Sequence, residues 1–341
     1  MSIGGKKALT FSFKMRPVRP ERELVDMLRK LLIRDPEGLL EIGRDDSSAR
    51  SLVGGIYVFN TDMVVQSTDL LPGMSLGQLA RKCVISNYSD LAAKGAKPLL
   101  FLASIGLPKD LEDKDFISIM RGLQRGVSEY DSYLSGGDIS EANEVIIAGF
   151  AAGRVLRRLV SRKDAQPGDL IFTTGSFGLT SLAYMHLLEG MDLPPGLRDL
   201  VLRAVYEPVA KVEQGICISE FASSSTDSSD GLYWSLKELS RASGYGYVVD
   251  NLPIDKRILS FVERAGLDPT EVVFHGGEEY ELVFTVSPDK VSQLEEVFER
   301  RGWDLLKIGH VISEPGVFLK HNENFLEVRE GGWEHFKSER K

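Results

Sequence analysis

A new block of secondary structure begins in the stretch SRKDAQPGDLIFTTGSFG (residues 161–178), whose pattern predicts a strand, a glycine turn and a helix. Before this stretch the chain predicts three strands that alternate with helices: GIYVFNTD (55–62), LLFLASIGLP (99–108) and EVIIAGFAAGRVL (144–156). After it, three more strands interleave with helices: GYVVD (246–250), YELVFTV (280–286) and LLKIGHVI (305–312). Two successive blocks of mixed strands and helices predict an α+β (mixed α/β) fold with two domains.

The change of pattern near residues 155–168 sets the expected domain limits. We expect three segments: a flexible N-terminal extension (1–22), an N-terminal domain (23–155) and a C-terminal domain (156–341). In the first domain, ERELVDMLRKLLIR (21–34) places its leucines on one helical face. SLGQLARKCVISNYSDLAAKGAKP (75–98) predicts a longer helix, with Ser75 as its cap and Gly95 as a stop signal.

The bulk composition indicates a soluble globular protein. Of its 341 residues 43% are hydrophobic and 27% charged, which is typical of that class. The formal net charge of −9 and the pI near 5.3 argue against a broad nucleic-acid footprint. Its cysteines, Cys83 and Cys217, match no zinc or redox spacing, and no apolar run is long enough for a signal peptide or a membrane span. We therefore expect a cytoplasmic protein without nucleic-acid or membrane partners.

Acidic residues recur where predicted elements end: Asp45, Asp46, Asp62, Asp69, Asp138, Asp227 and Asp230. Taken singly, each is explained by ordinary turn or helix-cap chemistry. Asp90 is harder to explain, because it lies among apolar residues inside a predicted helix, where a carboxylate needs a partner or a raised pKa. If these acids converge, a divalent cation is the natural partner. Oxygen ligands without His or Cys favour Mg²⁺ bound together with phosphates.

The common catalytic motifs are missing from the sequence. We find no GxxxxGK[ST] or GxGxxG phosphate loop, no HRD catalytic loop, no HExxH pair and no GxSxG turn. The segment TTGSFGLTS (173–181) predicts a glycine turn before a helix. It is either a phosphate site at a helix N-terminus or a simple tight turn, and the sequence does not choose between them.

Five motifs in this order resemble the thiamine-monophosphate kinases, a family within the aminoimidazole-ribonucleotide synthetase superfamily. The resemblance runs from about residue 40 to 336 and rests on these segments: NYSDLAAKGAKP (87–98), SGGD (135–138), SRKDAQPGDLIFTTGSFG (161–178), TDSSDGL (226–232) and HGGEEYELVFTV (275–286). It implies two α+β domains, with the N-terminal domains of two subunits joining in a homodimer. It also implies direct transfer of the ATP γ-phosphoryl group to thiamine monophosphate, with ATP as co-substrate and several Mg²⁺ ions.

Matched residue by residue, the resemblance implies three sets of site residues. The metal ligands are Asp45, Asp46, Asp62, Asp90, Asp138, Asp227 and Asp230. The ATP contacts are Thr61, Gly137, Asp138, Arg162 and Ser229. The substrate contacts are Asp69, Glu278 and Trp333. Within these sets, Asp230 and Arg162 are expected to serve catalysis most directly.

The sequence departs from the family pattern at four positions. Arg44 is inserted before the acid pair, Asn60 replaces a serine, Asp69 stands where many members have a histidine, and Glu279 replaces an aspartate. These departures bear on the substrate more than on the fold. Two alternatives therefore stay open: another ATP-using enzyme of the superfamily, such as a purine-ribotide ligase, and a non-catalytic nucleotide- or metal-binding module.

Overall fold

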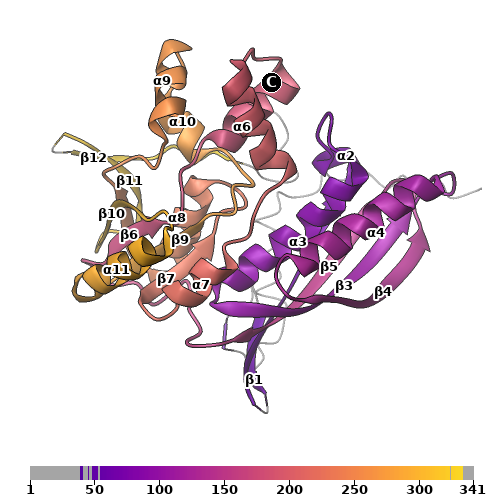
Figure 1. Ribbon diagram of the computed structural model, residues 1–341. Helices are drawn as coiled ribbons and strands as arrows, with labels where there is room; N and C mark the ends of the chain where they lie inside the picture. The colour runs from indigo at the N-terminus through magenta and orange to yellow at the C-terminus, as the bar shows by residue number, and fades with distance from the viewer. Residues whose placement is uncertain (1–38, 41–44, 46–47, 53, 323, 333–341) are drawn as a thin grey trace, which may run out of the picture. The chain divides into compact units, whose positions relative to one another are not determined.

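The computed structural model describes residues 39–40, 45, 48–52, 54–322 and 324–332, and these lie in one compact unit, Ile33–Trp333. Two sheets organise this unit, one of five strands in the order β1-β2-β5-β3-β4 and one of seven in the order β12-β11-β8-β10-β6-β9-β7 (Figure 1). The predicted α+β fold is confirmed. The domain limits stay a prediction, because the larger hydrophobic cluster runs from Ala49 to Phe298 and includes side chains of both halves of this unit, the half with the five-stranded sheet and the half with the seven-stranded sheet. The helix predicted at 21–34 lies outside the described residues.

The first sheet is antiparallel except for the parallel pair of β3 and β4. Helices α3 and α4 run side by side along one of its faces (Figure 1). The strands are β1 (Ser48–Leu52), β2 (Gly55–Val65), β3 (Ala96–Leu107), β4 (Tyr133–Glu141) and β5 (Ile146–Val155). The helices are α2 (Gln66–Asp69), α3 (Leu76–Ala93) and α4 (Asp113–Ser128).

Helix α3 is the central element of this half. It begins at the predicted cap, because the Ser75 hydroxyl accepts the Gln78 N–H and the Gln78 side chain accepts the Ser75 N–H. It ends before Gly95, whose φ of 71° a residue with a side chain rarely adopts. Fourteen of its residues are buried, and they include Lys82 and Asn87. A helix buried on nearly every side is a core helix, so its polar residues need partners inside the protein.

The second sheet is covered by helices on both faces. Its strands are β6 (Leu170–Thr173), β7 (Ala222–Asp227), β8 (Gly246–Val249), β9 (Leu282–Val286), β10 (Leu306–Ile312), β11 (Gly316–His321) and β12 (Asn324–Glu327). The helices of this half are α5 (Leu179–Glu189), α6 (Pro195–Tyr206), α7 (Val212–Ile218), α8 (Leu232–Ser243), α9 (Lys256–Arg264), α10 (Pro269–Phe274), the 3₁₀ turn η1 (Pro288–Lys290) and α11 (Val291–Arg301).

Alternation along the strands divides the side chains between these faces. Phe172 and Phe284 stack at 5.9 Å in the same cluster as the buried residues of α11. Ile171 and Val283 belong to the cluster that includes the buried residues of α8. Successive residues of a strand point to opposite faces, which explains this separation.

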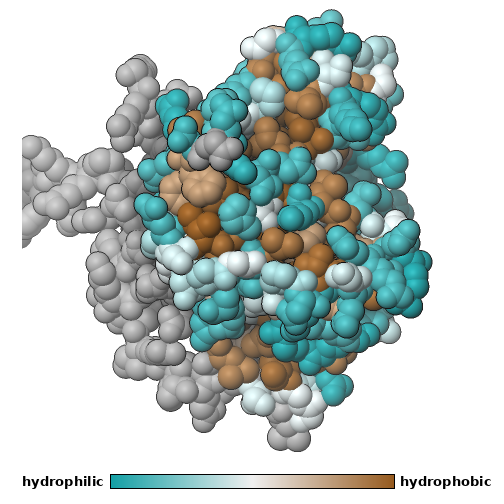
Figure 2. Space-filling view, turned by 90° about the vertical axis from the view of Figure 1, so that its left-hand side faces the viewer, coloured by the Kyte–Doolittle hydropathy of each residue, from teal (hydrophilic) through white to brown (hydrophobic). Residues whose placement is uncertain are grey.

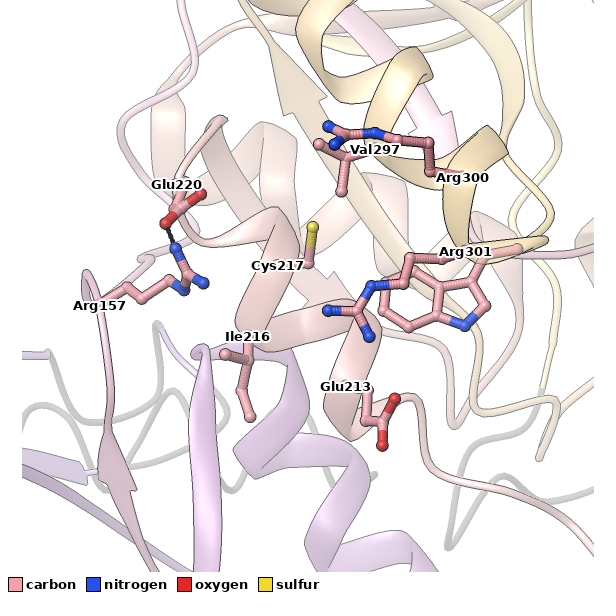
Figure 3. A pocket seen from close by; sticks show the side chains of 9 residues that line it. Arg157, Glu213, Ile216, Cys217, Glu220, Val297, Arg300 and Arg301 are labelled. Atoms are coloured by element: carbon pink, nitrogen blue, oxygen red, sulfur yellow. Dashed lines mark ion pairs between the residues drawn. The ribbon is translucent and has the colours of Figure 1, made fainter.

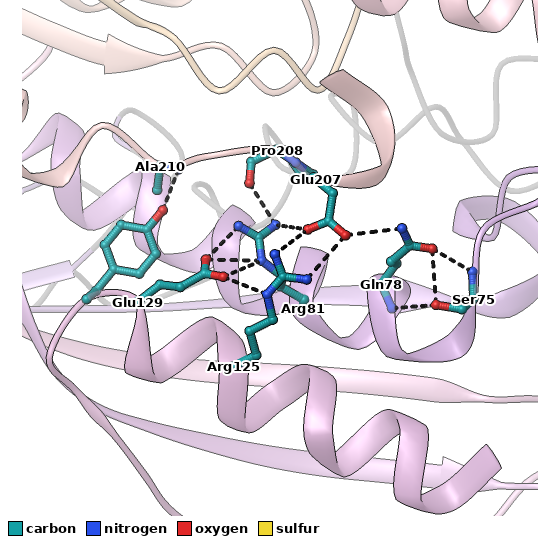
Figure 4. Close-up of polar contacts among 9 residues, drawn as sticks. Ser75, Gln78, Arg81, Arg125, Glu129, Glu207, Pro208 and Ala210 are labelled. Carbon is teal, nitrogen blue, oxygen red and sulfur yellow. Dashed lines mark hydrogen bonds and ion pairs between the residues drawn. The ribbon is translucent and has the colours of Figure 1, made fainter. Parts of the chain in front are cut away.

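A buried arginine joins the two halves (Figure 4). The Arg81 side chain, on α3, contacts Glu129 at 2.6 Å and Glu207, which follows α6, at 3.7 Å. It also donates to the Pro208 carbonyl at 2.8 Å. Arg125 of α4 pairs with the same two glutamates. Arg81 is the buried member of this network, and both glutamates are half-buried. The network links α3 to the chain that follows α6, and removing both glutamates would leave the buried Arg81 charge uncompensated.

The face drawn in Figure 2 carries hydrophobic patches separated by hydrophilic residues. Scattered apolar surface of this kind is normal for a folded protein. Among the described residues, no helix has both the length and the apolar character needed to cross a bilayer.

Candidate functional site

Three predicted acids come from three different elements of the two halves. Asp62 lies on β2, Asp90 on α3, and Asp227 is the last residue of β7. Sequence patterns did not predict β7, because ASSSTD is polar. It forms because Ser224 is buried and its hydroxyl shares a hydrogen bond with Thr285 of the neighbouring β9. This pairing brings Asp227 to the end of the strand, where it meets α3.

The three carboxylates influence one another electrostatically. Burial raises the pKa of Asp90 well above its ordinary value, and the negative charges of Asp227 and Asp62 raise it further. Burial is also the main cause of the raised pKa of Asp62 and of Asp227. The Asn60 amide donates to Asp90 at 2.8 Å, which favours its charged form. Asp227 is buried, and Asp62 and Asp90 are half-buried. These acids therefore form one partly buried anionic region that favours a cation.

Two basic residues border this region. The Lys94 ammonium is fully buried, forms an ion pair with Asp45 and donates to the Ser225 carbonyl at 3.2 Å. Arg162 donates from its side chain to the Thr226 hydroxyl at 3.2 Å and from its backbone N–H to Asp45 at 3.3 Å. Both charges lower the pKa of Asp227 against the effect of burial. The region thus combines carboxylates with cations, as a site for a metal-bound phosphate requires.

The loop after β7 is joined to the GGEEYEL segment. The Glu278 N–H donates to the Ser229 carbonyl at 2.6 Å, and the Tyr280 N–H donates to the Ser228 carbonyl at 2.9 Å. A side chain at Gly231, where φ is 103°, would overlap the carbonyl oxygen of Gly276, the first residue of this segment, and that of Phe274 just before it. The two motifs therefore form one surface. On it, Ser229 is exposed and Asp230 is half-buried.

Glu278 lies in the middle of a short polar network. Its carboxylate accepts from the Lys82 ammonium at 2.6 Å and from the Tyr184 hydroxyl at 2.6 Å. Burial raises the pKa of Tyr184, and the negative charge of Glu278 raises it further. Lys82 is on α3, one of the elements that also carry the buried acids.

Other predicted residues lie apart or have different partners. The Asp69 carboxylate accepts from the Val65 N–H at 2.8 Å and the Thr68 hydroxyl at 2.6 Å, so it closes its own turn. The Thr61 hydroxyl donates to the Gly149 carbonyl at 2.7 Å. Asp46 and Trp333 lie outside the described residues.

Gly137 and Asp138 are on the exposed edge strand β4. Gly137 pairs with Ala103, Ala103 with Gly149 and Gly149 with Asp62, so three strand spacings of about 4.8 Å separate Gly137 from Asp62, or roughly 14 Å. Asp138 therefore does not join the buried acids. Among the described residues, no three His, Cys, Asp or Glu side chains are arranged to hold one metal ion.

Sequence reasoning missed the two buried lysines, Lys82 and Lys94. Lys82 lies within α3 and Lys94 directly after it. As for Asp90, the residues next to each of them in the sequence are mostly apolar. A buried charge needs a partner, so the argument applied to Asp90 would also have identified them.

The turn at 173–181 does not present a free helix N-terminus. The Glu279 carboxylate accepts the N–H of Gly178, the residue before α5, at 2.5 Å. A carboxyl oxygen of Glu279 therefore already accepts the N–H at this helix start, which favours the tight-turn interpretation.

A surface pocket of about 460 Å³ lies between α7 and α11, away from these residues (Figure 3). Arg157, Arg300, Arg301, Cys217 and Trp303 are among the side chains that line it. Arg157 forms an ion pair with Glu220, and Arg301 lies over the Trp303 ring at 5.4 Å. None of the predicted site residues lines this pocket, so it is separate from the buried acids.

Comparison with known proteins identifies the family. Residues 45–155 match the AIR synthase related protein, N-terminal domain, and residues 166–322 match the AIR synthase related protein, C-terminal domain. The chain is 34% identical to a thiamine-monophosphate kinase of Pyrococcus horikoshii over 81% of this chain and 85% of that protein. It is 33% identical to one of Nitrosopumilus maritimus over 82% of this chain and 89% of that protein.

Solved structures agree with this family. A structure described as AaThiL complexed with AMPPCP and TMP is 27% identical, with a TM-score of 0.81 and coverage of 95% of this chain and 100% of that chain. Thiamine monophosphate kinase from Aquifex aeolicus is 26% identical, with a TM-score of 0.76 over 90% of this chain and 98% of that chain. HypE of E. coli, a hydrogenase maturation protein, is 18% identical with a TM-score of 0.67 over 90% and 96% of the two chains, and shares the fold alone. The chain belongs to the thiamine-monophosphate kinase family of AIR synthase related proteins.

Proposed function

We propose that this enzyme transfers the γ-phosphoryl group of ATP to the phosphate of thiamine monophosphate, which yields thiamine diphosphate and ADP. The observation that carries this proposal is the partly buried anionic region formed by Asp62, Asp90 and Asp227, bordered by Lys94 and Arg162. The relative described as bound to AMPPCP and TMP supports the same pair of ligands.

The donor set fits magnesium. Its members are oxygen ligands, and the mutual repulsion of the three buried carboxylates would be offset by a cation. Because no three of the described acids are arranged around one point, ions held partly by water and phosphate oxygens fit better than a cage made of protein alone. When bound, Mg²⁺ would neutralise charge on the reacting phosphates. We propose the following ligands: Asp45, Asp46, Asp62, Asp90, Asp227 and Asp230. We also propose Asp138, on the resemblance of SGGD to the family motif alone, since within one chain it lies on β4, three strand spacings from Asp62.

The residues of the chain itself would bind and orient the two phosphates. An oxygen of the thiamine monophosphate phosphate forms the new bond to the γ-phosphorus, and the bond between that phosphorus and the β-γ bridging oxygen breaks to release ADP. The attacking oxygen is already ionised, so no protein base is needed. We propose that Arg162, held by Thr226, contacts ATP together with Thr61, Gly137, Asp138 and Ser229. We propose that Glu278, Asp69 and Trp333 contact the thiamine side.

We also propose that two copies of the chain form a homodimer through the first sheet. Large hydrophobic side chains on its strands are exposed: Met63 is 55%, Tyr133 72% and Ile139 56% accessible. Tyr133 and Ile139 are on the edge strand β4, whose unpaired backbone groups invite pairing with another chain. Sedimentation equilibrium tests this, and a monomer at micromolar concentration would contradict it.

Product analysis tests the activity. Purified protein, ATP and Mg²⁺ are incubated with thiamine, with thiamine monophosphate, and without acceptor, and the products are separated by chromatography. We expect thiamine diphosphate and ADP in equal amounts, and only with the monophosphate. ADP in none of the reactions, or equally in all of them, would refute the proposed function.

A further inference from the structure

The Lys82–Glu278–Tyr184 network links the two halves of the chain at the site. Lys82 is 1% exposed, and its ammonium contacts Glu278 at 2.6 Å and the Asp69 carbonyl at 3.1 Å. The Tyr184 hydroxyl, on α5, donates to the other Glu278 oxygen at 2.6 Å. Lys82 comes from α3, Tyr184 from α5 and Glu278 from the loop before β9. Three elements therefore meet on one carboxylate.

The backbone of Glu278 is constrained as well. Its φ is 63°, which a residue with a side chain adopts only at an energetic cost. The N–H of Glu278 is bound by the Ser229 carbonyl and that of Tyr280 by the Ser228 carbonyl. The surrounding structure thus compels an unfavourable conformation, a feature that clusters at functional sites.

We propose that Lys82 is a positioning residue, which holds the Glu278 carboxylate in the orientation that receives the substrate. This inference rests on the proposed function, in which Glu278 contacts thiamine monophosphate. A glutamate side chain that is free to rotate would have to be ordered when the ligand binds, and each such side chain costs affinity. The two contacts at 2.6 Å order it beforehand.

The network also fixes the substrate side relative to the acids. Lys82 and Asp90 are on the same helix, and the Glu278 backbone is bound to the loop that follows Asp227. One rigid connection therefore runs from the buried acids to Glu278. Catalysis by positioning depends on such distances, because a misplacement of about 1 Å can cost about 10²-fold in rate.

The test compares Lys82→Met with a matched control on the same helix. Arg81→Met also removes a buried cation that contacts a glutamate at 2.6 Å, but its partners, Glu129 and Glu207, are not among the proposed site residues. Calorimetry measures the binding of thiamine monophosphate and, separately, of the ATP analogue AMPPCP with Mg²⁺. Steady-state kinetics give KM for each substrate and kcat.

We expect Lys82→Met to weaken thiamine monophosphate binding on the order of 10- to 100-fold, the effect of losing one charge-assisted hydrogen bond. AMPPCP binding should change by less than about threefold. Lys82→Arg should recover part of the loss, because it retains the charge. Arg81→Met should lower the melting temperature and leave both affinities near the wild-type values. Should Lys82→Met fail to fold, Tyr184→Phe removes only a hydroxyl and should weaken the same binding by about 3- to 10-fold.

The possible failures can be told apart. A wild-type protein that neither binds nor phosphorylates thiamine monophosphate refutes the proposed function and this role with it. Wild-type activity together with unchanged substrate binding in Lys82→Met and Tyr184→Phe overturns the role of Lys82 alone. Equal loss of both ligands in Lys82→Met, without recovery in Lys82→Arg, would reduce Lys82 to a structural residue and also overturns the inference.

Discussion

Replacing Glu279 by glutamine should stabilise the protein by an amount that grows with pH. Burial raises the pKa of Glu279 from 4.5 to about 8, against the effect of the Gly178 N–H that donates to it. The folded protein therefore holds this proton more tightly than the unfolded chain does. The stability that Glu279 contributes is complete below pH 4.5 and is lost progressively as the pH rises to about 8.

The size of the effect follows from the two pKa values. Each pH unit between 4.5 and about 8 costs about 1.4 kcal/mol, so the full loss is roughly 5 kcal/mol. At pH 7 about 3 kcal/mol of it should already be lost. The Glu279 side chain is not wholly shielded from solvent, so these figures are upper values. Glutamine stays neutral at every pH and can still accept the Gly178 N–H.

Urea unfolding at pH 5, 6, 7 and 8 measures the difference. The free energy of unfolding of Glu279→Gln minus that of the wild type should rise by as much as about 1.4 kcal/mol per pH unit. The difference cancels the pH dependence of all other groups. Glu295→Gln, on the exposed surface of α11, is the matched control and should show no such slope. A difference for Glu279→Gln that is independent of pH would refute the reasoning.

Three further changes probe the acids, the edge strand and the join between the halves. Asp90→Asn should lower turnover on the order of 10²- to 10³-fold. The free energy of unfolding should stay unchanged or rise, because burial disfavours the charge that the substitution removes. Turnover assays and urea unfolding check the two effects, and unimpaired turnover would contradict a role for this acid. Gly137→Ala should destabilise β4 by about 1–3 kcal/mol, because φ is 154° and a Cβ would overlap the Ala103 carbonyl. Backbone amides of β4 should then exchange hydrogen faster than in the wild type, and an unchanged exchange rate would contradict this prediction. Arg81→Met should lower the free energy of unfolding by about 2–3 kcal/mol, which is less than the loss of a fully buried pair because Glu129 is partly exposed. The melting temperature should fall on the order of 5 °C. Calorimetry measures this shift, and an unchanged Tm would mean that the network adds no stability.

Local patterns in the sequence were enough to predict most of the elements. The helix from Leu76 to Ala93 was predicted because Ser75 caps it and Gly95 stops it, and the structure confirms both ends. The strand β2 was predicted over residues 55–62, and the structure extends it to Val65. Signals of this kind act over a few residues, so a single sequence contains them.

The ordered motifs also identified the family. Asp90 was singled out from its apolar surroundings alone, and the structure places it, half-buried, beside Asp62 and Asp227. The strand β7 was missed, because its serines and threonine look like a loop and become a strand only by pairing with β9. The same limitation hid Lys82, whose partner Glu278 is 196 residues away along the chain.

Local sequence patterns and motifs were thus sufficient to predict most of the elements, the family and the kind of chemistry that the acids favour. The polar pairs could be found only from the folded chain: Lys94 with Asp45, Lys82 with Glu278, and Glu279 with the start of α5. It also separated Gly137 and its neighbour Asp138 from the buried acids by the width of three strands. The physical reason is that burial and electrostatic pairing depend on distances between segments far apart in the chain, whereas capping, turns and periodicity depend only on near neighbours.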